Sequence, residues 1–445
     1  MKKTFKIGGV HPHDNKISAN AATEIFPAIE TAYVSMAQHL GAPATPIVAV
    51  GDKVKVGQVI AEPAGFISGY VHSPVSGTVK AVAPRADIAG NMVMHVEITV
   101  EGDEWMEGID TSDTIVKDIP YTPEEIIAKV KACGIVGLGG ASFPTHVKLA
   151  PPKDKKAEAL ILNGTECEPY LTSDDRIMQE RPEEILIGAA IMMKALGVTR
   201  GYVGIEENKP AAIAAMKAAA AAFPQIRVIT LKKRYPQGGE KQLIDAVIGR
   251  QVPSGGLPID TGAVVQNVAT SLAVYEAVQK NKPLIDNVIT VTGQCLERQR
   301  NFKVRIGTPM SKIIEEAGGM PLKAAKVISG GPMMGRAIAN LDAATVKANG
   351  AILFLTEEQT RRKPESSCIR CAKCASACPM GLEPWLLNKL SRAGGRQAEL
   401  EQERVYDCIE CGCCSFTCPA NIPLLDMIRS SKAEVMKIMR SRPKK

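Results

Sequence analysis

Cysteines carry the strongest chemical signal in this chain. Nine of the twelve lie in the last fifth of its 445 residues, and eight of these form two runs with one common spacing. The runs are Cys368-x2-Cys371-x2-Cys374-x3-Cys378-Pro379 and Cys408-x2-Cys411-x2-Cys414-x3-Cys418-Pro419. Cysteines at this spacing ligate 4Fe-4S cubanes. Zinc instead takes two CxxC pairs separated by a longer loop, so a pair of zinc sites is the less favoured interpretation. The runs therefore predict two 4Fe-4S clusters.

The fourth cysteine of such a run commonly ligates the cluster of the other run. By that rule, one cluster is held by Cys368, Cys371, Cys374 and Cys418. The other is held by Cys408, Cys411, Cys414 and Cys378. Cys413 is left spare, because counting it as a ligand breaks the spacing. Leu, Lys, Arg and Glu recur at helical spacing over residues 386–405, which predicts a helical ferredoxin-type domain. A pair of clusters conducts single electrons, so it needs an electron donor or acceptor at each end.

A glycine-rich segment in the middle of the chain is a candidate for one of these ends. Gly137, Gly139 and Gly140 precede Phe143, and Lys148 follows. Glycines let backbone N–H groups approach a phosphate or a flat ring system, while the lysine adds a charge and the phenylalanine a stacking face. The segment is not the GxGxxG fingerprint, so it is a weak signal on its own.

Neighbouring segments strengthen this interpretation. The buried run 159–162 predicts a parallel strand, and it leads into a polar loop containing Asn163, Glu166 and Glu168. Further strands are expected at 201–205 and 227–231, alternating with helices at 183–196 and 209–222. The alternation predicts an α/β domain with a parallel sheet, which places ligands at the carboxyl ends of its strands. Two more polar segments follow, 235–241 and 265–270.

These four segments, in this order, resemble the flavin-binding domain of the NADH-oxidising subunit of respiratory complex I. The resemblance implies FMN contacts from Gly137, Gly139, Gly140, Lys148, Asn163, Glu166, Tyr235, Gly239, Asn267 and Thr270. It implies contacts to NAD(H), the substrate, from the residues expected to act in catalysis, Phe143, Glu168 and Glu240. Cys167 is interpreted as a packed small residue, and Cys133 and Cys295 as core residues.

The remaining segments predict a multidomain protein of α/β and α+β class. Short alternating strands with Gly, Pro and Asp turns predict an N-terminal β-sandwich hybrid in residues 1–110, which resembles biotinyl and lipoyl carrier domains. Its expected tip, 64–70, lacks the lysine that a carrier needs, so a structural or docking role is expected. The α/β FMN-binding domain is placed at 111–285, a β-grasp (SLBB-like) unit at 286–358, and the two-cluster ferredoxin domain at 359–445.

The complete order of domains resembles the C subunit of the Rnf complex, an ion-pumping ferredoxin:NAD oxidoreductase. The resemblance implies hydride exchange between NAD(H) and FMN, and single-electron transfer through the clusters. It also implies partner subunits in the membrane and at its cytoplasmic face, with ferredoxin engaged indirectly. Two alternatives stay open: a soluble flavin/iron–sulfur reductase, such as a cobalamin reductase, and an electron relay or scaffold without flavin.

Composition sets limits on the other functional classes. The net charge of +7 is mild, and no stripe of basic and aromatic residues suggests nucleic-acid binding. No segment reaches the roughly 18 consecutive apolar residues that span a bilayer, so any membrane link is expected to go through partners. Basic residues gather at 361–363 and 432–445. They are interpreted as a solvated surface or as a contact for an acidic partner or anionic lipid.

Overall fold

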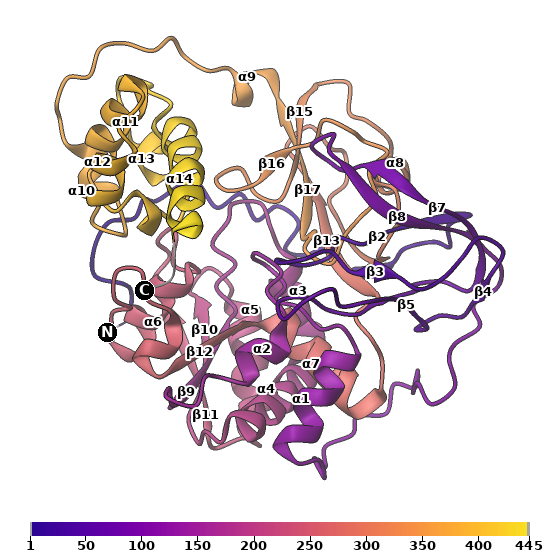
Figure 1. The fold of residues 1–445 in the computed structure, drawn as a ribbon. Helices are drawn as coiled ribbons and strands as arrows, with labels where there is room; N and C mark the ends of the chain where they lie inside the picture. Colours follow the sequence, from indigo (N-terminus) through magenta and orange to yellow (C-terminus); the bar gives the residue numbers. More distant parts are fainter. Residues whose placement is uncertain (1, 443–445) are drawn as a thin grey trace.

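The fold was analysed in a computed structural model, which describes residues 2–442. Four parts follow one another along the chain (Figure 1): a β-sandwich, an α/β domain, a second mixed unit and a helical C-terminal domain. The helical domain, in yellow, lies beside the α/β domain and away from the sandwich. The multidomain α/β and α+β fold predicted from the sequence is confirmed.

The sandwich packs two small antiparallel sheets face to face. One sheet has the order β2-β8-β7-β4 and the other β3-β5-β6. The strands are β2 (Thr31–Ser35), β3 (Thr45–Pro46), β4 (Lys53–Val54), β5 (Val59–Glu62), β6 (Val71–His72), β7 (Gly77–Ala86) and β8 (Met92–Val100). Alternate residues such as Val34, Ile60 and Ile98 point inward and form one buried core. The period of two in the sequence therefore reflects one buried face on each sheet.

Residues 2–26 run outside the sandwich as an extended arm. Lys3 bridges to Leu231 of the α/β domain, and the N–H of Gly9 donates to the carbonyl of Ala377 in the C-terminal domain at 2.8 Å. Strand β1 (Thr23–Ile25) then pairs with the edge of the third unit's sheet. The arm thus contacts three other parts of the molecule.

The α/β domain contains a four-stranded parallel sheet in the order β11-β10-β9-β12. The strands are β9 (Ala159–Asn163), β10 (Gly201–Glu206), β11 (Ile226–Leu231) and β12 (Ala263–Asn267). Both faces are covered, because Leu160 and Leu162 enter one apolar core while Ile161 enters another. Burial on both faces explains why β9 reads as a continuous apolar run.

Helices start and end in this domain where local sequence signals place them. They are α1 (Pro123–Ala132), α2 (Thr145–Leu149), α3 (Ser173–Glu180), α4 (Pro182–Leu196), α5 (Pro210–Ala220), α6 (Glu240–Ile248) and α7 (Val268–Lys280), with the 3-10 turn η1 (Pro258–Thr261). Thr122 and Glu125 form a capping box at the start of α1. Gly197 ends α4 in the left-handed region, with φ of 65°.

The third unit has a mixed six-stranded sheet in the order β1-β14-β13-β17-β15-β16. Its elements are β13 (Asp286–Thr292), β14 (Arg300–Arg305), α8 (Met310–Glu316), β15 (Ala324–Ser329), β16 (Arg336–Ala337), β17 (Ala351–Thr356) and α9 (Glu357–Thr360). Helix α8 packs Ile313 and Ile314 onto Phe302 and Phe354 of the sheet. The loop 330–335 leaves the end of β15 and reaches toward the α/β domain.

The C-terminal domain is helical, as the spacing of its residues predicted. An extended segment, 361–372, leads into α10 (Lys373–Ala377), α11 (Pro384–Ala393), α12 (Gln397–Gln402), η2 (Val405–Asp407), α13 (Cys413–Phe416) and α14 (Leu424–Ser441). Leu387, Leu400 and Ile428 form its core, and the cysteines pack against that core. Among the described residues, no helix is both long and apolar enough to cross a bilayer.

Candidate functional site

Two asparagines mark the carboxyl edge of the parallel sheet. Asn163 ends β9, Asn267 ends β12, and the two residues are direct register partners. The chain places β10 and β11 on one side of β9 and β12 on the other, so the connections diverge between β9 and β12. This point of divergence is where open α/β sheets bind their ligands. The structure thus brings both predicted asparagines to one crevice.

The glycine loop lies directly over this crevice. The N–H of Leu138 donates to the Thr270 hydroxyl at 2.8 Å, which ties the loop to the start of α7. A side chain at Gly139 would meet the Asn267 amide at 2.9 Å, while the space beside Gly140 is open. Gly139 also adopts a φ of 73°. Glycine is therefore required at Gly139 for close approach and for backbone conformation.

Lys148 and Glu240 face one another at the mouth of the crevice. The lysine Nζ donates to Glu240 Oε1 at 2.7 Å and to the carbonyl of Val265 at 3.1 Å. Their side chains are 29% and 39% exposed, so a ligand can reach both. Glu240 is the first residue of α6, and Gly239 precedes it as the N-cap. A cation and a helix N-terminus at one edge suit a phosphate group.

Asn267 has two separate tasks. Its Oδ1 accepts from the N–H of Ala269 at 2.7 Å and caps α7, while its Nδ2 donates to Asp174 Oδ2 at 2.7 Å. Burial, and then the nearby Glu166 carboxylate, raise the pKa of Asp174 to about 7. Asp174 has no distinctive signal in the sequence, because an acid in the first turn of a helix is an ordinary feature.

Asn163 fixes the neighbouring loop. Its Nδ2 donates to the carbonyl of Gly238 at 2.9 Å, and its Oδ1 accepts from the Thr165 hydroxyl at 2.7 Å. A side chain at Gly238 would meet that hydroxyl at 2.4 Å. These contacts close one wall, whereas the glycine loop leaves the opposite wall open. The open backbone of the glycine loop, the accessible Lys148 and the amides of Asn163 and Asn267 form a cradle that fits FMN.

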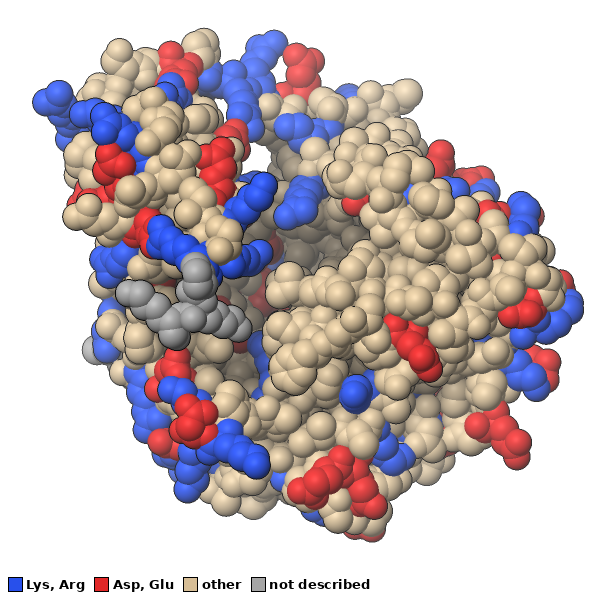
Figure 2. Space-filling model, in the orientation of Figure 1, with Lys and Arg blue, Asp and Glu red and all other residues tan. Residues whose placement is uncertain are grey.

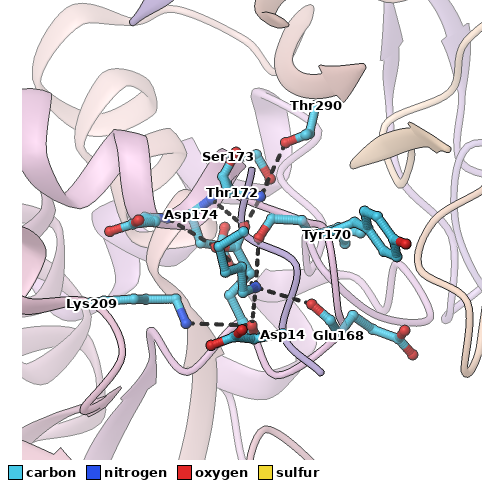
Figure 3. Close-up of polar contacts among 12 residues, drawn as sticks. Asp14, Glu168, Tyr170, Thr172, Ser173, Asp174, Lys209 and Thr290 are labelled. Atoms are coloured by element: carbon cyan, nitrogen blue, oxygen red, sulfur yellow. Dashed lines mark hydrogen bonds and ion pairs between the residues drawn. The ribbon is translucent and has the colours of Figure 1, made fainter. Parts of the chain in front are cut away.

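The Glu166 carboxylate hydrogen-bonds to backbone groups of the protein. Its carboxylate accepts from the N–H groups of Asp174 at 2.8 Å and Asp175 at 3.3 Å, at the start of α3. Two buried lysines hold the backbone of the same loop, as Figure 3 shows around Lys209. Lys209 donates to the carbonyl of Thr165 at 2.6 Å, and Lys16 of the N-terminal arm donates to the carbonyl of Glu166 at 2.7 Å. Burial lowers the pKa of Lys16 to about 8.

Glu168 and Tyr235 are also engaged by protein groups. The Glu168 carboxylate accepts from the N–H groups of Met333 at 3.1 Å and Met334 at 2.8 Å, in the loop after β15. Tyr235 is 2% exposed, and its hydroxyl lies near both this carboxylate and the C-terminal domain. Phe143, by contrast, is half-buried within the glycine loop. Of the three predicted catalytic residues, Glu240 lies beside Lys148, Phe143 belongs to the glycine loop, and Glu168 contacts the loop after β15.

Cysteines from both runs line one pocket of the C-terminal domain. They are Cys378, Cys408, Cys411 and Cys414, together with the spare Cys413 and apolar residues. Burial raises the pKa of Cys414 to about 12 and that of Cys408 to about 11, and neighbouring thiols of this group add to both shifts. Cross-ligation of one cluster by Cys378, Cys408, Cys411 and Cys414 stays a prediction, and all four residues line this pocket. Among the described residues, no three His, Cys, Asp or Glu side chains converge closely enough to hold one metal ion.

The other four cysteines lie toward solvent. Burial raises the pKa of Cys374, and the Cys418 thiol adds to the rise. Cys368 and Cys371 are exposed in the extended segment before α10. The spare Cys413 is fully buried, with its sulfur 3.9 Å from the carbonyl of Tyr235.

Comparisons with known families match every part of the chain. Residues 3–104 match the RnfC barrel sandwich hybrid domain and residues 130–276 the Nuo51 FMN-binding domain. Residues 288–337 match the SLBB domain and residues 360–427 the 4Fe-4S dicluster domain. The chain therefore binds FMN in its α/β domain and 4Fe-4S clusters in its C-terminal domain, in agreement with the cradle and the grouped cysteines.

Relatives that align over nearly the whole chain show the family to which it belongs. The C subunit of the proton-translocating ferredoxin:NAD(+) oxidoreductase complex of Clostridium ljungdahlii is 45% identical, over 98% of this chain and 94% of the relative. The chain belongs to the family of these C subunits. The corresponding subunit of the Na(+)-translocating complex of Acetobacterium woodii is 43% identical, over 97% of both chains. The C subunit of an ion-translocating oxidoreductase complex from Rhodobacter capsulatus is 41% identical, over 88% of this chain and 76% of the relative.

A solved structure supports the fold of this C subunit. An NAD+-reducing nickel–iron hydrogenase in its H2-reduced state aligns with a TM-score of 0.50 at 17% identity, covering 72% of this chain and 67% of that one. At this level of identity the likeness concerns the fold alone.

Proposed function

We propose that this chain is the NAD(H)-reacting subunit of a membrane-bound, ion-pumping ferredoxin:NAD oxidoreductase. It exchanges hydride with NAD(H) at FMN and passes single electrons through two 4Fe-4S clusters. The observation that carries the proposal is the full-length identity to the C subunits of such complexes, combined with an FMN-binding domain that contacts the dicluster domain directly. The same full-length identity favours this function over a soluble cobalamin reductase.

The cradle residues have distinct proposed roles. FMN, when bound, supplies the chemistry that links a two-electron hydride carrier to one-electron clusters. Lys148 and the N–H groups of the glycine loop hold the FMN phosphate and ring. Phe143 stacks on the nicotinamide nucleotide, and Glu240 orients it at the mouth of the crevice. The remaining cradle residues that bind FMN are Gly137, Gly139, Gly140, Asn163, Gly239, Asn267 and Thr270.

We propose an indirect role in ligand binding for Glu166, Glu168 and Tyr235. Their polar groups already have protein partners, so we propose that they shape the wall behind the cradle. Burial keeps water from the Tyr235 part of this wall, since Tyr235 belongs to an apolar cluster with Val10 and Cys411.

The contacts between domains favour one order for the clusters. The pocket of Cys378, Cys408, Cys411 and Cys414 lies on the side that touches the α/β domain, where Gln242 Nε2 donates to the carbonyl of Pro379 at 3.1 Å. Cys368 and Cys371 face solvent. We therefore propose that electrons pass between the flavin and the buried cluster first, and that the exposed cluster exchanges them with a partner.

The partners are proposed on the same basis. Other subunits of the complex hold the chain at the cytoplasmic face of the membrane, and ferredoxin delivers electrons indirectly. Figure 2 shows Lys and Arg side chains spread over the C-terminal domain at the upper left, beside a hollow in the surface. Lys363, Arg370 and Lys373 next to the exposed cysteines form no ion pair among the described residues. Such a surface suits an acidic electron-transfer partner.

Anaerobic reconstitution with iron, sulfide and FMN tests the proposal. Visible and EPR spectra are recorded before and after NADH is added. Bleaching of the flavin bands together with a new cluster signal is the expected result, because both steps then occur on one chain. A preparation with about eight irons per chain and bound flavin that does not respond to NADH would contradict it.

A further inference from the structure

Tyr235 connects the flavin domain with one specific cluster ligand. Its hydroxyl lies 2.9 Å from the backbone carbonyl of Cys411 and 3.3 Å from Glu168 Oε1. A phenol has one proton, and the shorter contact directs it toward the Cys411 carbonyl. The tyrosine is 2% exposed, so water does not compete for this contact.

Glu168 extends the connection to the β-grasp unit. Its two carboxylate oxygens accept from the N–H groups of Met333 and Met334, at 3.1 and 2.8 Å. A side chain at Gly331 would stand 2.1 Å from Glu168 Oε2, so this loop can approach the carboxylate only because it has a glycine there. One half-buried carboxylate and one buried phenol thus join three domains next to Cys411.

The remaining contacts of the dicluster domain surround the same point. Gln242 donates to the carbonyl of Pro379, the N–H of Gly9 donates to the carbonyl of Ala377, and Ser254 bonds to Asp407. A side chain at Gly412 would lie 3.2 Å from the carbonyl of Met333. The pocket of Cys378, Cys408, Cys411 and Cys414 is lined by residues of its own domain, and these contacts from other domains reach the backbone next to its lining residues.

We infer that Tyr235 and Glu168 are positioning residues that tune the cluster of Cys378, Cys408, Cys411 and Cys414. The Tyr235 O–H points its positive end toward the backbone of Cys411, one of the residues that would hold this cluster, and a donor there favours the reduced, more negative form. The Glu168 carboxylate carries the opposite sign and stabilises the oxidised form. The inference deepens the proposed electron path and rests on it only for the direction of electron flow, because the residue contacts are independent of NAD(H).

The test compares Tyr235→Phe with Glu168→Gln in the full chain reconstituted with iron, sulfide and FMN. Each variant is titrated with dithionite and redox mediators, and the EPR signals of both clusters are followed. Tyr235→Phe is expected to shift the midpoint potential of one cluster to a more negative value. Glu168→Gln is expected to shift the same cluster to a more positive value. The second cluster, which includes the exposed Cys368 and Cys371, is expected to stay unchanged in both.

Opposite shifts separate this role from simple loosening of the interface, which would move both variants in one direction. Tyr275→Phe is the matched control, because it is also a buried tyrosine with a backbone partner, the N–H of Val116 at 3.1 Å. It should leave both potentials unchanged. Equal potentials in all four proteins, or same-direction shifts in the two variants, would overturn the inference. Since the titration uses no NADH, it remains decisive even if the NAD(H) proposal fails.

Discussion

Asn163 and Asn267 are paired in register at the last positions of two adjacent parallel strands. The relationship arises because β12 returns beside β9 rather than beside β11. Asn163 anchors the loop that contains Gly238, and Asn267 starts α7 and contacts Asp174. Asn163 and Asn267 therefore position both walls of the cradle.

The two tasks of Asn267 can be separated by substitution. Asn267→Ser retains a helix cap but loses the amide that donates to the buried Asp174, so the protein should bind FMN about fivefold to tenfold more weakly and lose about 1 kcal/mol of stability from the unpaired acid. Asn267→Ala loses the cap as well and should unfold about 1 kcal/mol more easily than the serine variant. Flavin fluorescence titration and chemical unfolding measure the two effects. Wild-type FMN affinity in the serine variant would count against a flavin contact from this amide.

Lys148 and Glu240 should affect different ligands although they form one ion pair. Lys148→Met removes a charged donor and should weaken FMN binding roughly tenfold to a hundredfold. Glu240→Ala, like Phe143→Ala, should slow NADH oxidation while flavin and both clusters are retained. Flavin content, iron content and steady-state NADH oxidation distinguish these outcomes. Unchanged NADH oxidation in both Glu240→Ala and Phe143→Ala would remove these residues from the proposed nucleotide site.

Local signals in the sequence predicted much of this architecture. The run 159–162 was expected as a buried strand and forms most of β9. The helical spacing over 386–405 predicted a helical C-terminal domain, and α11 and α12 lie there. Each of these features depends on neighbours in sequence or on a fixed spacing, so it can be recognised without the fold.

Other features depend on contacts between distant segments. Lys16 and Lys209 are buried against the backbone of one loop, yet a lysine in sequence is expected at the surface. Glu168 meets Met333 and Met334, which lie more than 160 residues away. The resemblance to a flavin site assigned Glu168 to the nucleotide, because the loop after β15 could not be placed from sequence. Tertiary structure alone reveals these partners.

Cross-ligation makes a specific prediction about which cysteine variants share a phenotype. Cys378→Ala and Cys411→Ala, from different runs, should lose the same EPR signal, because their sulfurs line one pocket. Cys418→Ala and Cys371→Ala should lose the other signal. Each variant should lack about four irons and still bind flavin. Cys413→Ser serves as the control and should keep both clusters. If Cys378→Ala instead matched Cys371→Ala, each run would ligate its own cluster.

Lys347 is a buried amine at the junction of three domains. It is 1% exposed, and its Nζ donates to the carbonyls of Tyr70 at 3.2 Å and Gly134 at 2.7 Å. It forms no ion pair among the described residues, and burial lowers its pKa from 10.5 to about 7. Two neighbouring groups have pKa values far from 7, because burial lowers the pKa of His72 to about 3 and raises that of Cys133 to about 11.

Between pH 7 and 10.5 the folded protein therefore binds fewer protons at Lys347 than the unfolded chain, so the free energy of unfolding should rise with pH. Lys347→Met removes this contribution, and the stability of the variant relative to wild type should fall steadily from pH 7 to pH 9. Urea unfolding at several pH values measures the difference. Lys323→Met, at an exposed lysine of the same unit, should show a difference that does not change with pH. A constant difference for Lys347→Met would mean that Lys347 stays charged when buried.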